Sequence, residues 1–118
     1  TGHATSNLAE WRGASAVTAR VDQYLANLER DATHLDRDGI RRGSVILDPP
    51  RSGAGKDVID RLAGFGPAQL VYVACDPVAL ARDTGLLLGH GYTLDWMRAY
   101  DLFPNTHHFE TVARFVRA

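Results

Sequence analysis

Two apolar runs that each end at a proline constrain the fold of this chain more than any other feature. Residues 45–47 (VIL) run into Asp48-Pro49-Pro50, and residues 70–74 (LVYVA) run into Cys75-Asp76-Pro77. Short runs without polar alternation are typical of strands in parallel sheets, and proline cannot continue the hydrogen-bonded ladder. An apolar stripe at helical spacing follows each run, which predicts strand–helix units in an open α/β sheet.

The other expected elements follow from the same spacing of apolar side chains. We expect helices over residues 22–32, 58–65 and 77–89, and further strands over 14–21, 92–100 and 110–116. The charged segment 35–43 and residues 103–108 are expected to be loops. Because the last two strands follow each other without a helix between them, we predict an antiparallel hairpin that closes the sheet.

The composition fits one globular domain of 118 residues, in which residues 1–7 form a small, polar lead-in that we expect to be disordered. The formal net charge is −1, so nucleic-acid binding would need a local basic patch or parts of a longer protein. The single cysteine cannot form an internal disulfide, which favours a reducing compartment. No stretch approaches the ~20 apolar residues that cross a bilayer. We therefore expect a cytoplasmic protein that has no membrane contact.

Cys75 is the first candidate for chemistry, because it lies where a strand ends and a helix can begin. Open α/β sheets present their reactive groups at the carboxyl ends of strands. A thiolate at that place is stabilised by the unpaired N–H groups of the helix and is a usable nucleophile. The alternative is an inert buried cysteine that packs as a small hydrophobic residue.

Carboxylates, an arginine and two histidines are the other candidates. Asp48 is oriented by two rigid prolines, or else it is an ordinary acidic residue that starts a turn. Arg51 could bind a phosphate or stack on a base, or pair with a surface carboxylate. Glu110 would serve as a general base if burial made its carboxylate more basic. Adjacent His107 and His108 point opposite ways in an extended segment and lack a partner at metal-ligand spacing, so we predict no metal site.

Three segments go beyond a general α/β pattern. They are residues 47–53 (LDPPRSG), residues 71–77 (VYVACDP) with 80–83 (LARD), and residues 101–110 (DLFPNTHHFE). In this order and spacing they resemble the uracil-C5 RNA methyltransferases, which make 5-methyluridine in tRNA and ribosomal RNA with S-adenosylmethionine. The resemblance runs from about Val45 to Phe115 and implies an α/β fold, a partial Rossmann-like methyltransferase sheet with flanking helices.

The resemblance implies a role for each candidate residue. Cys75 matches the nucleophile that adds to C6 of the uracil ring, and Glu110 matches the base that later removes the C5 proton. Asp48 matches an acidic residue of the pocket for the cofactor and the target base. Uracil C5 is too poor a nucleophile to take a methyl group from a sulfonium, whereas addition of a thiolate at C6 makes C5 electron-rich. The target base must be flipped out or already unpaired.

The chain departs from the family pattern in two ways. The usual Ser-Cys-Asn-Pro reads Ala74-Cys75-Asp76-Pro77, and the charge of Asp76 opposes thiolate formation. The Gly-rich loop and the acidic residue that hold the cofactor in the family are missing, as are its RNA-binding domains. We therefore expect residues 8–118 to be the C-terminal portion of a catalytic domain, inactive as an isolated chain. A sheet without its central first strand exposes an edge, so we also expect self-association into a homo-oligomer.

Two other functions stay open from the sequence. A degenerate methyltransferase-like domain could serve as an interaction module, which the missing loop and Asp76 favour. A methyltransferase for another base or a protein is the other alternative, because residues 48–51 (DPPR) resemble the Asp/Asn-Pro-Pro-aromatic loop of amino-group methyltransferases. Arg51 in place of the aromatic residue argues against that second alternative.

Overall fold

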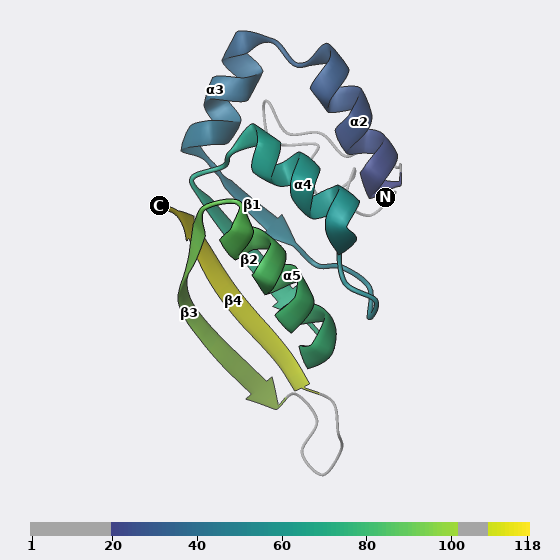
Figure 1. Cartoon of the computed structure of the whole chain (residues 1–118), viewed down its shortest axis with the longest axis vertical. Coiled ribbons are helices and arrows are strands. Elements are labelled where there is room, and N and C mark those ends of the chain that lie inside the picture. Colours follow the sequence, from purple (N-terminus) through teal and green to yellow (C-terminus); the bar gives the residue numbers. More distant parts are fainter. Residues whose placement is uncertain (1–19, 102–108) are drawn as a thin grey trace, which may run out of the picture.

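The computed structural model describes residues 20–101 and 109–118, which form one four-stranded sheet with helices beside it (Figure 1). The strands are β1 (Ser44–Leu47), β2 (Gln69–Ala74), β3 (Tyr92–Asp101) and β4 (Phe109–Arg117), in the spatial order β1-β2-β4-β3. β1 and β2 are parallel, whereas β4 is antiparallel to both β2 and β3. The predicted α/β sheet and its C-terminal antiparallel hairpin are both confirmed.

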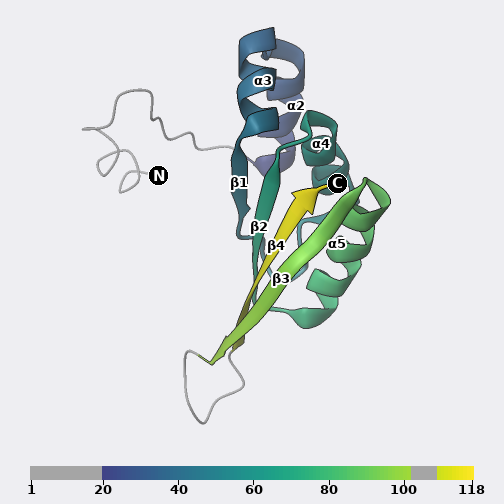
Figure 2. The ribbon, with the colours of Figure 1, turned by 90° about the vertical axis from the view of Figure 1, so that its left-hand side faces the viewer.

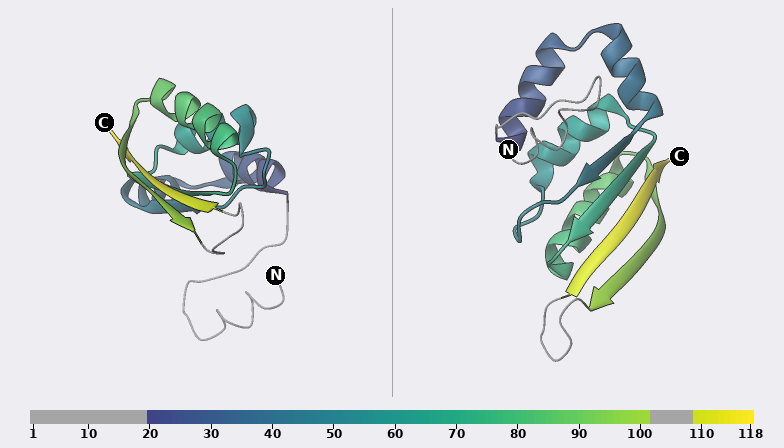
Figure 3. Two further views of the ribbon diagram at one scale, coloured as in Figure 1. Left: turned by 90° about the horizontal axis from the view of Figure 1, so that it is seen from below. Right: turned by 180° about the vertical axis from the view of Figure 1, so that it is seen from behind.

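The helices are α2 (Val21–Asp31), α3 (His34–Arg42), α4 (Gly55–Phe65) and α5 (Pro77–Gly89). α4 and α5 lie side by side on one face of the sheet, and α2 packs against α4 beyond the β1 edge (Figures 2 and 3). In the described part of the chain, no helix is long and apolar enough to cross a bilayer.

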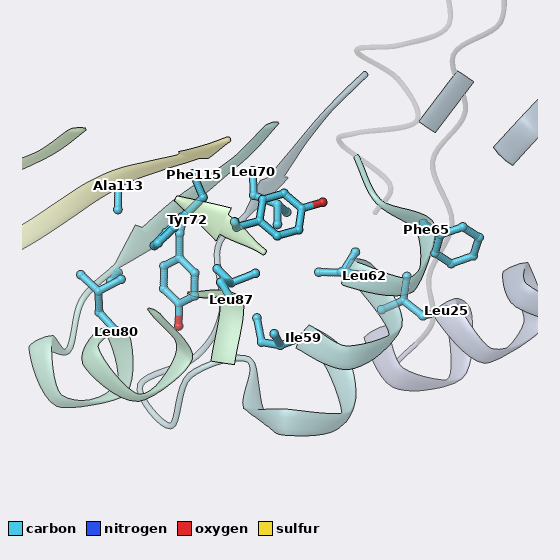
Figure 4. Packing of buried hydrophobic residues seen from close by; sticks show 12 residues of the cluster. Leu25, Ile59, Leu62, Phe65, Leu70, Tyr72, Leu80, Leu87, Ala113 and Phe115 are labelled. Atoms are coloured by element: carbon cyan, nitrogen blue, oxygen red, sulfur yellow. The ribbon is translucent and has the colours of Figure 1, made fainter. Parts of the chain in front are cut away.

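The hydrophobic core fills the space between the sheet and helices α4 and α5 (Figure 4). Leu70, Tyr72 and Ala74 of β2 are buried while the residues between them are half-exposed. On β4, Ala113 and Phe115 are the buried positions. Because side chains alternate along a strand, these five residues define the covered face of the sheet. The opposite face carries the intervening residues of both strands.

Helix α3 contradicts the expectation that residues 35–43 form a loop. The helix begins with a capping box, in which the Thr33 hydroxyl accepts from the Asp36 N–H at 3.1 Å and the Asp36 carboxylate accepts from the Thr33 N–H at 3.0 Å. An ion pair between Arg42 and Asp38 supports its last turn. No residue of α3 is fully buried. The charged sequence showed no apolar stripe and therefore did not indicate this helix, whose first turn is stabilised by the capping box.

The C-terminal end of α4 and the start of α5 agree with the sequence-based prediction. α4 is followed by Gly66, whose φ of 66° is in the left-handed region that favours glycine. α5 begins with Pro77. The start of α4 differs, because the helix begins at Gly55, before the expected residue 58.

The strand expected over residues 14–21 is not found at its described end. Arg20 is the N-cap of α2 and Val21 is its first residue. Residues 14–19, the lead-in over 1–7 and the loop over 103–108 lie outside the described residues.

β1 is not buried on both faces, although unbroken apolar runs such as residues 45–47 are typical of strands that are. Val45 and Leu47 pack against the core, whereas Ile46 between them is on the other face and is 74% exposed. In the described part of the chain β1 is an edge strand and is hydrogen-bonded to β2 alone. The parallel pairing that the same residues predicted is nevertheless confirmed.

Candidate active site

Two of the candidate residues lie at the same end of the sheet, at the carboxyl ends of β1 and β2. The two strands are parallel and in register, with Leu47 beside Tyr72. Asp48 follows β1 directly, and Cys75 follows β2 directly. Both residues are exposed. The structure therefore has an accessible carboxylate and an accessible thiol where open α/β sheets bind their ligands.

Glu110 lies at the same end of the sheet, near the start of the antiparallel strand β4. The last pair in the ladder between β2 and β4 is Ala74 with Thr111. Cys75 is the residue after Ala74, just beyond the end of β2, and Glu110 is the residue before Thr111 on β4. Thr111 pairs with Ala74 of the covered face, so the alternation along β4 assigns Glu110 to the opposite face of the sheet. Glu110 is half-buried there, with Tyr100 of β3 as its register partner on the other side.

Asp76 caps the N-terminus of α5, a structural role that was not predicted from the sequence. Its carboxylate caps α5 by accepting from the N–H of Val78 at 2.8 Å and from the N–H of Ala79 at 3.2 Å. These N–H groups are among those expected to stabilise a thiolate at Cys75, and Asp76 already binds them. An aspartate before proline at the start of an apolar helix is a known capping signal, which could have revealed this role.

A pocket of about 690 Å³ opens at the carboxyl end of β1. Its walls come from the end of β1, the segment that follows it, and the first turns of α2 and α4; among its lining residues are Ile46, Asp48, Pro49 and Val58. The lining also includes the charged residues Arg20, Asp22, Lys56 and Asp57. Carboxylates beside apolar walls can accept hydrogen bonds from hydroxyl or amino groups while a flat ring packs on the walls. A second pocket, of about 710 Å³, lies between α2, α3 and β1 and is lined mainly by apolar residues.

The two histidines of the sequence analysis, at positions 107 and 108, lie outside the described residues. Within residues 20–101 and 109–118, no group of three or more His, Cys, Asp or Glu side chains is placed to hold a metal ion.

A family model described as tRNA (Uracil-5-)-methyltransferase matches residues 22–117 of the chain. This chain is a member of that family. The match includes Asp48, Cys75 and Glu110, and it confirms the family resemblance that the three sequence segments indicated.

Proteins similar to this methyltransferase chain are much longer than it is. An uncharacterized RNA methyltransferase of Bifidobacterium longum is 45% identical over 82% of the chain, which corresponds to 22% of that relative. The 23S rRNA (uracil(1939)-C(5))-methyltransferase RlmD of Vibrio cholerae is 42% identical over 80% of the chain and 21% of its own length. The chain thus spans about a fifth of the curated relatives it matches.

Two solved structures resemble this chain in fold. The tRNA (uracil-54, C5)-methyltransferase of Pyrococcus abyssi, in complex with S-adenosyl-L-homocysteine, matches 62% of the chain and 18% of its own length with a TM-score of 0.56 and 42% identity. The M1.HpyAVI–SAM complex matches 86% of the chain and 52% of its own length with a TM-score of 0.62. Its 14% identity limits that second likeness to the fold.

A further residue of the methyltransferase chain escaped the sequence analysis. Asp83 on α5 has no exposed surface, and its carboxylate accepts from the N–H of Ala54 at 2.7 Å and from the hydroxyl of Tyr72. Burial, followed by this hydrogen bond, raises the pKa of Tyr72 above its ordinary value of 10.0. In the sequence, the feature that could have indicated this buried position was a charged residue on the apolar side of a predicted helix.

Proposed function

We propose that this chain is the C-terminal part of the catalytic domain of an enzyme that methylates C5 of a uridine in tRNA or rRNA. The observation that supports the proposal is the ladder between β2 and β4, whose last pair is Ala74 and Thr111; Cys75 comes directly after Ala74, and Glu110 comes directly before Thr111. A nucleophile and a base at the same end of two neighbouring strands suit a reaction at two adjacent ring atoms. The family membership supports the same chemistry.

The reaction begins at Cys75. Its thiolate adds to C6 of the uracil ring, the C6–S bond forms, and the electron pair of the C5=C6 bond moves toward C5 and the C4 oxygen. C5 is then a carbon nucleophile. S-adenosylmethionine, when bound, supplies the electrophilic methyl group that C5 accepts.

Glu110 completes the reaction as the general base. Its carboxylate takes the proton from C5, the C5=C6 bond re-forms, and the sulfur leaves C6 as a thiolate. The proton passes from Glu110 to solvent, so both groups return to their starting states. Adjacent strands are about 4.8 Å apart, a spacing that lets a thiol and a carboxylate address the edge of one pyrimidine. The uridine must be unpaired or turned out of its helix to reach them.

The pocket at the end of β1 suits S-adenosylmethionine in its chemistry. Asp48 offers a carboxylate to hydroxyl or amino groups of the cofactor, or to the cationic sulfonium end. The apolar walls around Ile46 and Val58 suit a flat ring. We propose Asp48 as the cofactor-binding residue of this chain. The matched region is only about a fifth of these relatives' length, so we further propose that the isolated chain is inactive without the segments they carry.

The test uses the full-length protein that carries this chain, together with S-adenosylmethionine and RNA in which 5-fluorouridine replaces uridine. Fluorine cannot leave C5 as a proton does, so the covalent product should accumulate. Mass spectrometry should find it on the tryptic peptide 62–82, which contains the single cysteine of the chain. Cys75→Ala and Cys75→Ser should both abolish it. An adduct that persists in either variant would show that Cys75 is not the nucleophile.

A further inference from the structure

The N-terminus of α4 is capped by a residue from another helix. Ala54, the residue before α4, makes no side-chain capping hydrogen bond, so the local sequence leaves the first N–H groups without a partner of their own. Asp83 on α5 supplies it: the Asp83 carboxylate accepts from the Ala54 N–H at 2.7 Å and from the Gly55 N–H at 3.3 Å. This cap connects positions 28 and 29 residues apart in the sequence.

The buried charge of Asp83 is fully engaged by its surroundings. Besides the two N–H groups, the hydroxyl of Tyr72 on β2 donates to it. The Arg82 guanidinium lies 3.7 Å from the other carboxylate oxygen and also donates to the Ser52 carbonyl. A buried carboxylate is costly unless donors of this kind surround it. Asp83 therefore links α5, β2 and the residues that precede α4 into one hydrogen-bonded unit.

The loop over residues 48–54 is shaped to lie directly on this carboxylate. Gly53 has a φ of +84°, and a Cβ placed on it would come within 2.7 Å of an Asp83 oxygen and 2.6 Å of Arg82 Nη2. Its N–H donates to the Pro50 carbonyl at 2.8 Å and closes the turn. Only a residue without a side chain allows this approach. One end of the loop is thus fixed by β1 and the other by Asp83.

We propose that Asp83 is a positioning residue for the reaction, which holds the Asp48-bearing loop over residues 48–54 against the helix that begins just after Cys75. This inference rests on the proposed function for its kinetic consequence. Asp83 is buried beneath the loop and does not itself touch substrate or cofactor. Its effect on the reaction passes through Asp48, the residue proposed to bind S-adenosylmethionine.

The experiment compares three variants of the full-length protein. Asp83→Asn leaves one acceptor but turns an NH₂ group toward the backbone N–H groups, and Gly53→Ala pushes the loop away from the carboxylate. Asp60→Asn is the matched control, because Asp60 also joins α4 to α5, through His90 at 2.6 Å, but it lies outside the Asp83 cluster. The readouts are the KM for S-adenosylmethionine and the amide hydrogen exchange of peptides that cover residues 52–60.

We expect Asp83→Asn and Gly53→Ala to raise the KM by about tenfold or more, as misplaced binding groups do, and to accelerate exchange at Ala54 and Gly55. Asp60→Asn should change neither the KM for S-adenosylmethionine nor the exchange rates of the Ala54 and Gly55 amides. Unchanged exchange, or faster exchange with an unchanged KM, would overturn the proposal. If Asp83→Asn does not fold, Gly53→Ala decides the question. If the wild-type protein fails to methylate uridine, the proposed function fails, while exchange at Ala54 and Gly55 still decides whether Asp83 holds the loop.

Discussion

Ala74 of β2 and Thr111 of β4 form the last pair of their antiparallel ladder, and the next residues on the two strands are Cys75 and Glu110. In the sequence, 34 residues lie between Cys75 and Glu110, but both lie at the same end of these two strands because β4 runs back along β2. This arrangement supports the separate roles that the family resemblance implies for the thiol and the carboxylate.

The role of Glu110 predicts that Glu110→Gln stalls the reaction after the thiol has added. The amide cannot take the C5 proton, so turnover should fall by about 10²- to 10⁴-fold while methylated RNA stays bound to Cys75. Denaturing electrophoresis with labelled unmodified RNA measures both quantities. Glu29→Gln is the control, because Glu29 is on α2, away from the end of the sheet where Glu110 lies, and this variant should keep the wild-type turnover rate. Wild-type turnover in Glu110→Gln would refute the assignment.

The cap at Asp76 predicts different results for two substitutions. Asp76→Ala removes the acceptor for the Val78 and Ala79 N–H groups and should lower the free energy of unfolding by about 1 kcal/mol. Asp76→Asn keeps an acceptor and should cost only a few tenths of that. Urea unfolding measures both stability losses, and equal losses would contradict this account.

Two glycines at the end of α4 predict opposite effects of the same substitution. Gly66 has a φ of 66°, and an added Cβ would lie 3.3 Å from Arg41 Nη1, so Gly66→Ala should destabilise the fold by about 1–2 kcal/mol. Gly64 is inside the helix with nothing within 4 Å of an added Cβ. Gly64→Ala should stabilise it by roughly 0.5–1 kcal/mol. Urea unfolding of both variants checks the pair, and a stabilised Gly66→Ala would contradict the helix-end geometry.

Local patterns predicted those parts of the molecule that local physics determines. Proline and glycine set the ends of α4 and α5, and unbroken apolar runs gave β1 and β2. The capping box of Thr33 and Asp36 was present in the sequence, but without an apolar stripe the charged segment did not indicate a helix. Asp83 could not be assigned, because its partners Ala54 and Tyr72 are known only from the folded chain. The approach of Glu110 to the end of β2 likewise depends on the strand order β1-β2-β4-β3, which local patterns do not determine.

Tyr72 predicts a loss of stability in alkaline solution. Burial and the hydrogen bond to Asp83 raise its pKa above 10.0, so the folded state holds the phenol proton more tightly than the unfolded state. The resulting stabilisation is complete below the unfolded pKa and is lost as pH rises toward the folded value. The free energy of unfolding should therefore begin to fall at about pH 10 and continue to fall as the pH rises further. Tyr72→Phe should be less stable at pH 8 and should show a smaller alkaline decline; an equal decline would exclude Tyr72 as its source.

The edge strand β1 predicts that the isolated chain associates with itself. In the described part of the molecule β1 is hydrogen-bonded on one side only, and Ile46 at its centre is 74% exposed. Open edges of this kind pair with other strands, and a lysine on the edge prevents such pairing. Light scattering on a size-exclusion column should give a mass above that of one chain, and Ile46→Lys should return the mass to 12.9 kDa. Lys56→Ile, which adds an apolar residue on α4 away from the open strand edge, leaves that edge unchanged and so should leave the association through β1 in place. A stable wild-type monomer would contradict the predicted association through β1.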